Sequence, residues 1–178
     1  MPLHPDLAGR KALVTGGSRG IGAAIALLFA EAGADVAVNY RSRAAEAERV
    51  VAGISARGRR ALALAADVAD GAQVAAMFAR LAAEFGGIDI LVNNAGIALR
   101  GGVDDMTEAD FDRTIAVNLK SVFLCTQAAL PHMRAQRWGR IVNVSSGAAR
   151  GAGGVGPHYN ASKAGMEGMT RGYAARLV

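Results

Sequence analysis

A tyrosine and a lysine near the carboxyl end of the chain could exchange a proton with a carbonyl or an alcohol. Tyr159 and Lys163 are four residues apart, a spacing that shares one face of a helix. A free tyrosine loses its proton only well above neutral pH, and a nearby ammonium group favours the phenolate. Tyr159 could then protonate a carbonyl oxygen as hydride arrives, or deprotonate an alcohol. The spacing alone also fits a surface tyrosine beside a solvated lysine.

Two further polar side chains precede this pair in the chain. Ser146 follows the apolar run 140–144, and its hydroxyl could hydrogen-bond a substrate carbonyl as an oxyanion donor does. Asn118 lies within an expected helix, where amide side chains are not favoured. Each residue alone also fits an ordinary loop or an exposed helix position. We take Asn118, Ser146, Tyr159 and Lys163 as the candidate catalytic residues.

A glycine-rich segment near the amino terminus could bind the phosphates of a nucleotide. Residues 15–22 read TGGSRGIG, with Gly16, Gly20 and Gly22 in the spacing G-x-x-x-G-x-G rather than the strict G-x-G-x-x-G. Glycines let the backbone approach a pyrophosphate, and the helix that follows presents free N–H groups and a positive dipole end. An ordinary glycine-rich turn between a strand and a helix is the alternative.

The end of the second expected strand indicates which nicotinamide cofactor fits. A carboxylate there would bond the ribose 2′-hydroxyl and favour NAD. The chain instead reads Asn39-Tyr40-Arg41-Ser42. Arg41, together with Arg19 of the glycine-rich segment, could pair with a 2′-phosphate, although Arg41 could also be a solvated surface residue. We therefore expect NADP(H).

Short apolar runs alternate with amphipathic segments along the chain, which predicts a parallel sheet covered by helices on both faces. Strands are expected over 12–14, 36–40, 61–65, 88–93 and 140–144. Helices are expected over 21–32, 44–56 and 72–85, one helix or a pair of helices over 107–136, and a last helix from 158 that continues to the end of the chain. Thr107 and Asp110 resemble a capping box, and Pro131 is expected to kink the fourth helix. Such a sheet binds ligands at the carboxyl ends of its strands, where the candidate residues lie.

Composition narrows the class of protein. The 178 residues are 52% hydrophobic and 20% charged, which predicts one globular domain over 1–178. The net charge of +5 indicates charged side chains on a solvated surface rather than a site that binds nucleic acid. Cys125, the only cysteine, lies in an apolar stretch and is expected to be a buried, inert thiol. No apolar stretch reaches membrane length and no leader is apparent, so we expect a cytoplasmic protein without membrane or metal partners.

Six ordered motifs together resemble the short-chain dehydrogenase/reductase family, and the resemblance runs from Lys11 to the end of the chain. They are TGGSRGIG at 15–22, DV at 67–68, NNAG at 93–96, Asn118, NVSS at 143–146 and YNASK at 159–163. The resemblance implies a doubly wound Rossmann-type α/β fold. It also implies hydride transfer between NADP(H) and a carbonyl or secondary alcohol, most often a 3-oxoacyl thioester, with other ketones, sugars and steroids as open alternatives.

The resemblance assigns a role to each matching residue. Tyr159 would be the acid/base, and Lys163 would bind the nicotinamide ribose and favour the tyrosinate. Ser146 would hold the substrate oxygen, Asn118 would position a water in a proton relay, and Asn93 would tie neighbouring strands together. The cofactor-binding residues would be Gly16, Ser18, Arg19, Gly20, Ile21, Gly22, Asn39, Tyr40, Arg41, Asp67, Val68, Asn94, Ala95 and Gly96, with Tyr159 and Lys163. Asp67 would bond the adenine amino group.

Family members continue past the last helix into two more strands and a segment that covers the substrate. The chain is therefore expected to be incomplete at its carboxyl end, with the last strands missing and the fifth strand left as an exposed edge. A truncated module that binds NADP(H) without catalysis is the alternative function. Relatives usually pair through the helix from Thr107 and the helix after Tyr159, so we expect a homodimer, with a tetramer less well supported. Sedimentation as a monomer at high concentration would contradict the pairing.

Overall fold

The computed structural model describes residues 6–177 and contains one sheet of five parallel strands, in the order β3-β2-β1-β4-β5. The strands are β1 Lys11–Val14, β2 Asp35–Tyr40, β3 Ala61–Ala65, β4 Ile90–Asn93 and β5 Arg140–Asn143. The helices are α1 Gly20–Glu31, α2 Ala44–Ser55, α3 Gly71–Phe85, α4 Glu108–Ile115, α5 Ser121–Ala135 and α6 Pro157–Ala174, with short turns η1 Ala116–Lys120 and η2 Gly147–Ala149. The strand order reverses direction between β1 and β4, as the Rossmann-type prediction requires.

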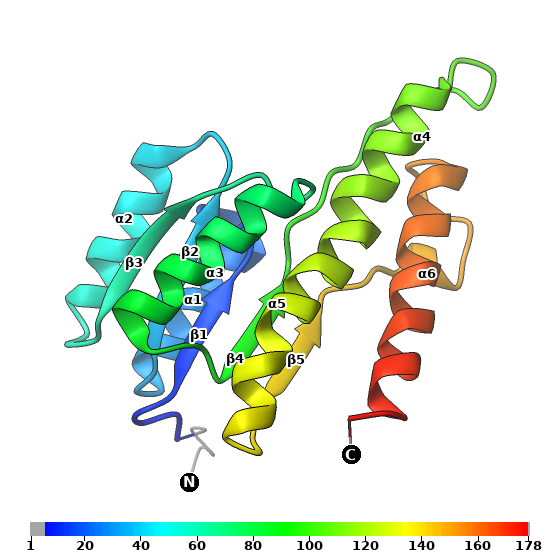
Figure 1. Ribbon diagram of the computed structural model, residues 1–178. Coiled ribbons are helices and arrows are strands. Elements are labelled where there is room, and N and C mark those ends of the chain that lie inside the picture. The colour runs from blue at the N-terminus through cyan, green and yellow to red at the C-terminus, as the bar shows by residue number, and fades with distance from the viewer. Residues whose placement is uncertain (1–5, 178) are drawn as a thin grey trace, which may run out of the picture.

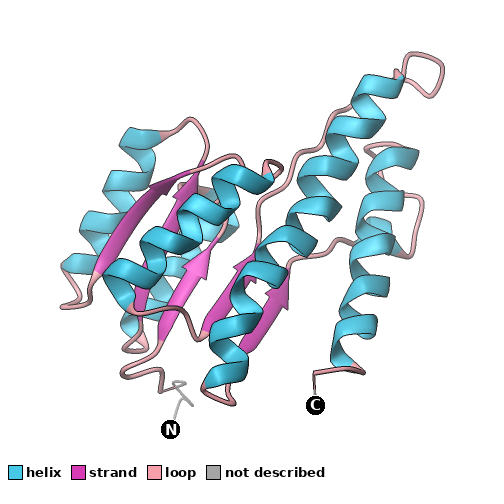
Figure 2. Cartoon of the chain, viewed as in Figure 1, coloured by secondary structure: helices cyan, strands magenta, loops and turns pink. Residues whose placement is uncertain are grey.

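Helices cover both faces of the sheet, and alternate strand residues build two separate cores. On one face, Leu13 and Leu91 pack with residues of α3 and α5 such as Leu81. On the other face, Val36 and Val92 pack with residues of α1 and α2. Figures 1 and 2 show α3 and α5 in front of the sheet. Because both faces are buried, the strands are apolar nearly throughout, which explains the alternation in the sequence.

Helix ends follow the local signals of the sequence. Asp70 caps α3 by accepting hydrogen bonds from the N–H groups of Ala72 and Gln73, and Gly86 ends the helix in the left-handed conformation at φ 73°. At the start of α4, Thr107 and Asp110 form the predicted capping box. The expected helix boundaries are therefore correct to within a residue or two in these regions.

The segment 107–136 forms a pair of helices, one of the two expected arrangements, but the break between them does not lie at Pro131. The chain passes from α4 to α5 through one π turn, Ala116–Lys120, whereas α5 continues through Pro131 to Ala135. Proline lacks the N–H that would donate one helical hydrogen bond, and α5 remains helical on both sides of Pro131. The π turn inserts an extra residue into the helix and turns Asn118 inward, where it is fully buried.

The carboxyl-terminal part differs from its expected form in one respect. The last helix was expected to continue to the end of the chain, but α6 ends at Ala174. As expected, β5 lies at an edge of the sheet, and its Val142 is 48% exposed. Cys125 lies on the buried side of α5, and burial raises the pKa of its thiol to about 12, as expected of an inert thiol. Over residues 6–177, no helix combines the length and apolar character needed to cross a bilayer.

Candidate active site

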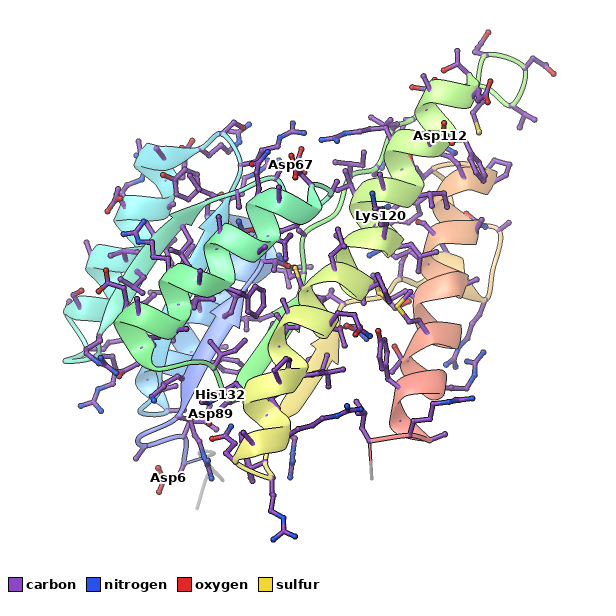
Figure 3. The ribbon with its side chains drawn as sticks, viewed as in Figure 1. Asp6, Asp67, Asp89, Asp112, Lys120 and His132 are labelled. Atoms are coloured by element: carbon purple, nitrogen blue, oxygen red, sulfur yellow. The ribbon has the colours of Figure 1, made fainter. Side chains whose placement is uncertain are left out.

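A cleft of about 450 Å³ opens at the carboxyl ends of the strands, around the point where the strand order reverses. Figure 3 labels Asp67 at this edge and Asp89 at the opposite edge of the sheet. Every residue predicted to bind the cofactor, apart from Tyr159 and Lys163, lines the cleft. The remaining lining residues are Ser42, Arg43, Ala66, Ile97, Arg113 and Val117. The structure therefore gathers segments that follow four different strands into one concave surface.

Thr15 joins the glycine-rich loop to the end of β4. Its hydroxyl donates to the Val92 carbonyl at 3.2 Å and accepts from the N–H groups of Asn94 and Ala95, each at 3.0 Å. The Asn94 amide donates in return to the carbonyls of Thr15 and Gly16, at 2.9 and 3.0 Å. These five hydrogen bonds hold two sides of the cleft at a fixed separation.

Two glycines of the loop are required by this close packing. Gly16 has φ 60°, and a Cβ there would lie 2.9 Å from the Cα of Ala95. At Gly22, a Cβ would lie 2.5 Å from both the Asn94 amide nitrogen and the Gly16 carbonyl oxygen. The next helix begins at Gly20, and its N-cap residue Arg19 makes no side-chain cap, so a bound anion could accept from the first-turn N–H groups. The loop therefore fits a pyrophosphate on its own geometry.

Asn39 lines the cleft, but its amide group holds the backbone in place. The side chain is 2% exposed, and its Oδ1 accepts from the Gly16 N–H at 3.2 Å. Its Nδ2 donates to the carbonyls of Leu64 and Ala66, at 3.2 and 3.0 Å. The side chain of Asn39 thus ties the glycine-rich loop to β3, a role that the motif alone does not indicate.

A carboxylate and two guanidinium groups meet at one end of the cleft. The Oδ2 atom of Asp67 lies 2.9 Å from Nη2 of Arg113 and 3.7 Å from Nη1 of Arg41. Burial favours protonation of Asp67, but the hydrogen bond from the Ala69 N–H and the two guanidinium groups outweigh it and hold the pKa of Asp67 below its ordinary value. Asp67 is therefore ionised at neutral pH, inside a cluster of cations. Sequence reasoning missed Arg113, because nothing in its local sequence shows that this side of α4 faces the cleft.

The lysine of the candidate catalytic pair is buried beside the tyrosine. Lys163 is 4% exposed, its Nζ donates to the Val144 carbonyl at 2.8 Å, and the same atom lies 5.8 Å from the ring centroid of Tyr159. Burial lowers the pKa of Lys163. A Cβ added to Gly96, which lines the cleft, would lie 3.8 Å from this Nζ. The ammonium group of Lys163 is therefore next to both the tyrosine ring and the cleft.

Asn118 lies on the π turn Ala116–Lys120 and contacts the segment after β4 and the first turns of α6. Its Oδ1 accepts from the Ile97 N–H at 2.8 Å, and its Nδ2 donates to the Ile97 carbonyl at 2.9 Å and to the Ser162 hydroxyl at 3.2 Å. The Ser162 hydroxyl donates to the carbonyl of Tyr159 at 2.7 Å. One amide therefore connects the segment after β4 to the first turns of α6.

Replacing Asn118 with leucine is expected to lower the free energy of unfolding by about 2 kcal/mol, because both backbone polar groups of Ile97 lose their partner. Urea denaturation measures this change. The control is Gln127→Leu, the same amide-to-alkyl change at an exposed position of α5, which should alter stability by less than about 0.5 kcal/mol. Equal effects of the two substitutions would contradict the structural role of the Asn118 amide.

Ser146 lies between the end of β5 and η2. Its Oγ accepts from the Ala148 N–H at 3.2 Å, which caps the short 3₁₀ turn and leaves the hydroxyl proton available to a substrate oxygen. The Val144 carbonyl, bonded by Lys163, lies two residues earlier in the chain. Asn93, predicted to tie neighbouring strands, does so by donating to the Asn143 side chain at 2.8 Å.

His158 was also missed by sequence reasoning. It is 2% exposed, and its Nε2 lies 3.0 Å from the Leu99 carbonyl. A carbonyl can only accept, so Nε2 carries the proton. The hydrogen bond fastens the loop after β4 to the residue next to Tyr159. His158 belongs to no periodic pattern and to no motif of the sequence, so nothing in the sequence indicated this contact.

Comparison with known proteins identifies the family and agrees with the fold. The family model described as short chain dehydrogenase matches residues 10–178. The 3-oxoacyl-(acyl-carrier-protein) reductase FabG of Staphylococcus aureus is 46% identical over 171 residues, covering 95% of this chain and 69% of that protein. The (2S)-((R)-hydroxy(phenyl)methyl)succinyl-CoA dehydrogenase subunit BbsD of Thauera aromatica is 47% identical, covering 94% and 67%.

A solved structure shows the same likeness in three dimensions. The short chain dehydrogenase from Burkholderia cenocepacia in complex with NADP is 49% identical, with a TM-score of 0.88, covering 96% of this chain and 69% of that one. The chain therefore belongs to the short-chain dehydrogenase/reductase family of oxidoreductases, which use NAD(P)(H) to transform small molecules.

Proposed function

We propose that the protein transfers hydride between NADP(H) and a carbonyl or secondary alcohol, with a 3-oxoacyl thioester as the favoured substrate class. The observation that carries the proposal is the position of the Lys163 ammonium group, 5.8 Å from the ring centroid of Tyr159 and close to Gly96 of the cleft. The candidate proton donor and the cleft thus lie on either flank of one ammonium group. Reduction of a carbonyl needs both of them.

Bound NADPH would supply the hydride, and the chain would supply the rest. The glycine-rich loop and the first turn of α1 would hold the pyrophosphate, with Asn94, Ala95 and Gly96 along the ribose. Ser146 would donate its hydroxyl proton in a hydrogen bond to the substrate carbonyl. Tyr159 would give its phenolic proton to that oxygen, and the ammonium group of Lys163 would stabilise the phenolate that remains. Asn118 fixes the segment after β4 against α6 and keeps these groups in register.

The cations of the cleft favour NADPH over NADH. Arg19 and Arg41 both line it, and guanidinium groups pair well with a phosphate. Arg41→Gln is expected to weaken NADPH binding by about 10-fold while NADH binding changes little. Hydrogen bonds to charged groups are worth about 1.5–3 kcal/mol, and the lower end applies because the Arg41 side chain is 57% exposed. Titration of the purified protein with each cofactor measures both constants. Tighter binding of NADH than of NADPH by the wild type would overturn the cofactor assignment.

The substrate class rests on the two relatives. The names of both relatives describe an acyl group on a thioester carrier, acyl carrier protein in one case and coenzyme A in the other. A short 3-oxoacyl thioester should therefore be reduced faster than a simple ketone of similar size, in an assay that follows NADPH consumption. Preference for the simple ketone would move the assignment to another carbonyl class.

A module that binds NADP(H) without catalysis is the second candidate. The cleft is lined by the segments that follow the first four strands and by residues of α4 and η1, whereas the relatives are longer than this chain. Stoichiometric NADPH binding without turnover on any carbonyl would favour the non-catalytic module.

The homodimer remains a prediction. It is in line with the exposure of two aromatic side chains, Phe111 on α4 and Phe123 on α5, which are 44% and 46% exposed.

A further inference from the structure

The proposed reaction brings two hydroxyl groups of the chain to one substrate oxygen. Ser146 would hydrogen-bond that oxygen while Tyr159 protonates it, so the two hydroxyls must be held in register with each other. Tyr159 belongs to α6, whereas Ser146 precedes the turn η2 and accepts from the Ala148 N–H of the same turn. That bond fixes the serine to its turn but does not attach the turn to α6. The alignment of the two hydroxyls therefore depends on the contacts between the turn and the helix.

One carboxylate of α6 contacts the chain on both sides of Ser146. The Oε2 atom of Glu167 accepts a hydrogen bond from Nε of Arg150 at 3.0 Å, and its Oε1 accepts from the Ser145 hydroxyl at 3.4 Å. Ser145 directly precedes Ser146, and Arg150 follows the last residue of η2, which spans Gly147–Ala149. The two oxygens of one carboxylate therefore tie both ends of the segment that carries Ser146.

The position of Glu167 on α6 relates these ties to the proton donor. Tyr159, Lys163 and Glu167 follow one another at intervals of four residues, so they lie on successive turns of one face of the helix. The Nζ atom of Lys163 donates to the carbonyl of Val144 at 2.8 Å, and Val144 directly precedes Ser145. Lys163 and Glu167 thus hold adjacent residues against the helical face from which Tyr159 would donate its proton.

We propose that Glu167 is a positioning residue that keeps the hydroxyl of Ser146 in line with that of Tyr159, by clamping Ser145 and Arg150 to α6. The inference rests on the proposed reductase function. Without the carboxylate, η2 would keep its own backbone hydrogen bonds but could turn relative to α6. Ser146 would then donate a poorer hydrogen bond to the substrate oxygen in the transition state. Glu167, Ser145 and Arg150 do not line the cofactor cleft, so NADPH binding should not depend on the clamp.

The test measures kcat, KM for a short 3-oxoacyl thioester and the NADPH dissociation constant. Glu167→Ala should lower kcat by about 10-fold, less than the roughly 10²- to 10³-fold cost of losing an oxyanion donor, and should change NADPH affinity by less than about 2-fold. Glu167→Gln should restore kcat to within about 3-fold of the wild type, because an amide can accept from Arg150 and donate to the Ser145 oxygen. The control is Glu84→Ala, at an exposed glutamate near the end of α3, which should leave kcat unchanged.

A double-mutant cycle with Ser146 separates positioning from a general structural role. In a Ser146→Ala background, Glu167→Ala should change the residual kcat by less than about 2-fold, because no hydroxyl remains to be positioned. An equal 10-fold loss in that background, flagged here as roughly the single-variant effect, would show that Glu167 does not act through Ser146 and would overturn the inference.

The remaining outcomes distinguish the inference from the proposed function. Wild-type protein that reduces no carbonyl would overturn the reductase function and the positioning role with it. An active wild type whose kcat is unaffected by Glu167→Ala would overturn the positioning role alone. If Glu167→Ala fails to fold, Arg150→Met decides, because the Arg150 side chain is 82% exposed and its loss should not unfold the chain. Removal of this one tie should lower kcat by about 3-fold with NADPH affinity preserved, and wild-type kcat would overturn the clamp.

Discussion

Replacing Tyr159 with phenylalanine is expected to reduce turnover by about 10²- to 10⁴-fold, the usual contribution of a positioned general acid. The substitution removes one hydroxyl and keeps the ring that lies 5.8 Å from the Lys163 ammonium group. The cleft around the glycine-rich loop does not include the Tyr159 side chain, so NADPH affinity should change by no more than about 3-fold. Steady-state assays and cofactor titration on the same preparation measure both quantities.

Tyr173→Phe provides the matched control. Tyr173 lies near the far end of the same helix, and its hydroxyl accepts a hydrogen bond from Gln127 at 2.8 Å. The same atom is removed at a distance from the cleft, and turnover should be preserved. Tyr159→Phe with wild-type turnover would exclude Tyr159 as the proton donor, whatever the control shows.

Lys163→Met is expected to have the second-largest effect, again a loss of turnover of about 10²-fold or more. The side chain of methionine fills a similar volume without a charge, so the phenolate of Tyr159 loses the ammonium group that stabilises it. NADPH affinity should also fall several-fold, because Lys163 is the residue proposed to bind the nicotinamide ribose. Lys120→Met, at an exposed lysine two residues after Asn118, should preserve both quantities.

The pH dependence of stability checks that Lys163 is buried as a charge. Burial lowers its pKa from the ordinary value of 10.5. Between the lowered pKa of the folded protein and 10.5, the unfolded chain binds more protons at this residue, so the wild type gains stability as pH rises through that window. Lys163→Met lacks this gain. Denaturation of both proteins at neutral and alkaline pH should show the wild type gaining on the variant, and parallel pH profiles would contradict the burial of a charge.

The order of the elements and the composition of the cleft could be predicted from the sequence, for a physical reason. A parallel sheet buried on both faces requires apolar strands, and loops such as Thr15-Gly16-Gly17 must follow them at the same edge. Because all these strands are parallel, the segments around Arg41, Asp67 and Asn94 must meet at that edge. The structure places all of them on one cleft.

What the sequence could not show depends on helix rotation and on side chains that bond the backbone. Whether α4 turns Arg113 toward Asp67 depends on packing between elements far apart in the chain, and the π turn that buries Asn118 shifts the helical phase at that point. Asn39 and His158 act through carbonyl and N–H groups, which carry no residue-type signal. Such contacts leave no periodic pattern.

The most direct test compares NADPH consumption by the wild-type chain and by Tyr159→Phe, with a short 3-oxoacyl thioester as substrate. If the cleft and the Tyr159–Lys163 pair form a working reductase, the wild type will consume NADPH in proportion to product, and Tyr159→Phe will bind NADPH but consume almost none. Turnover that is equal in the two proteins would show that the proton comes from elsewhere and would contradict the proposed site.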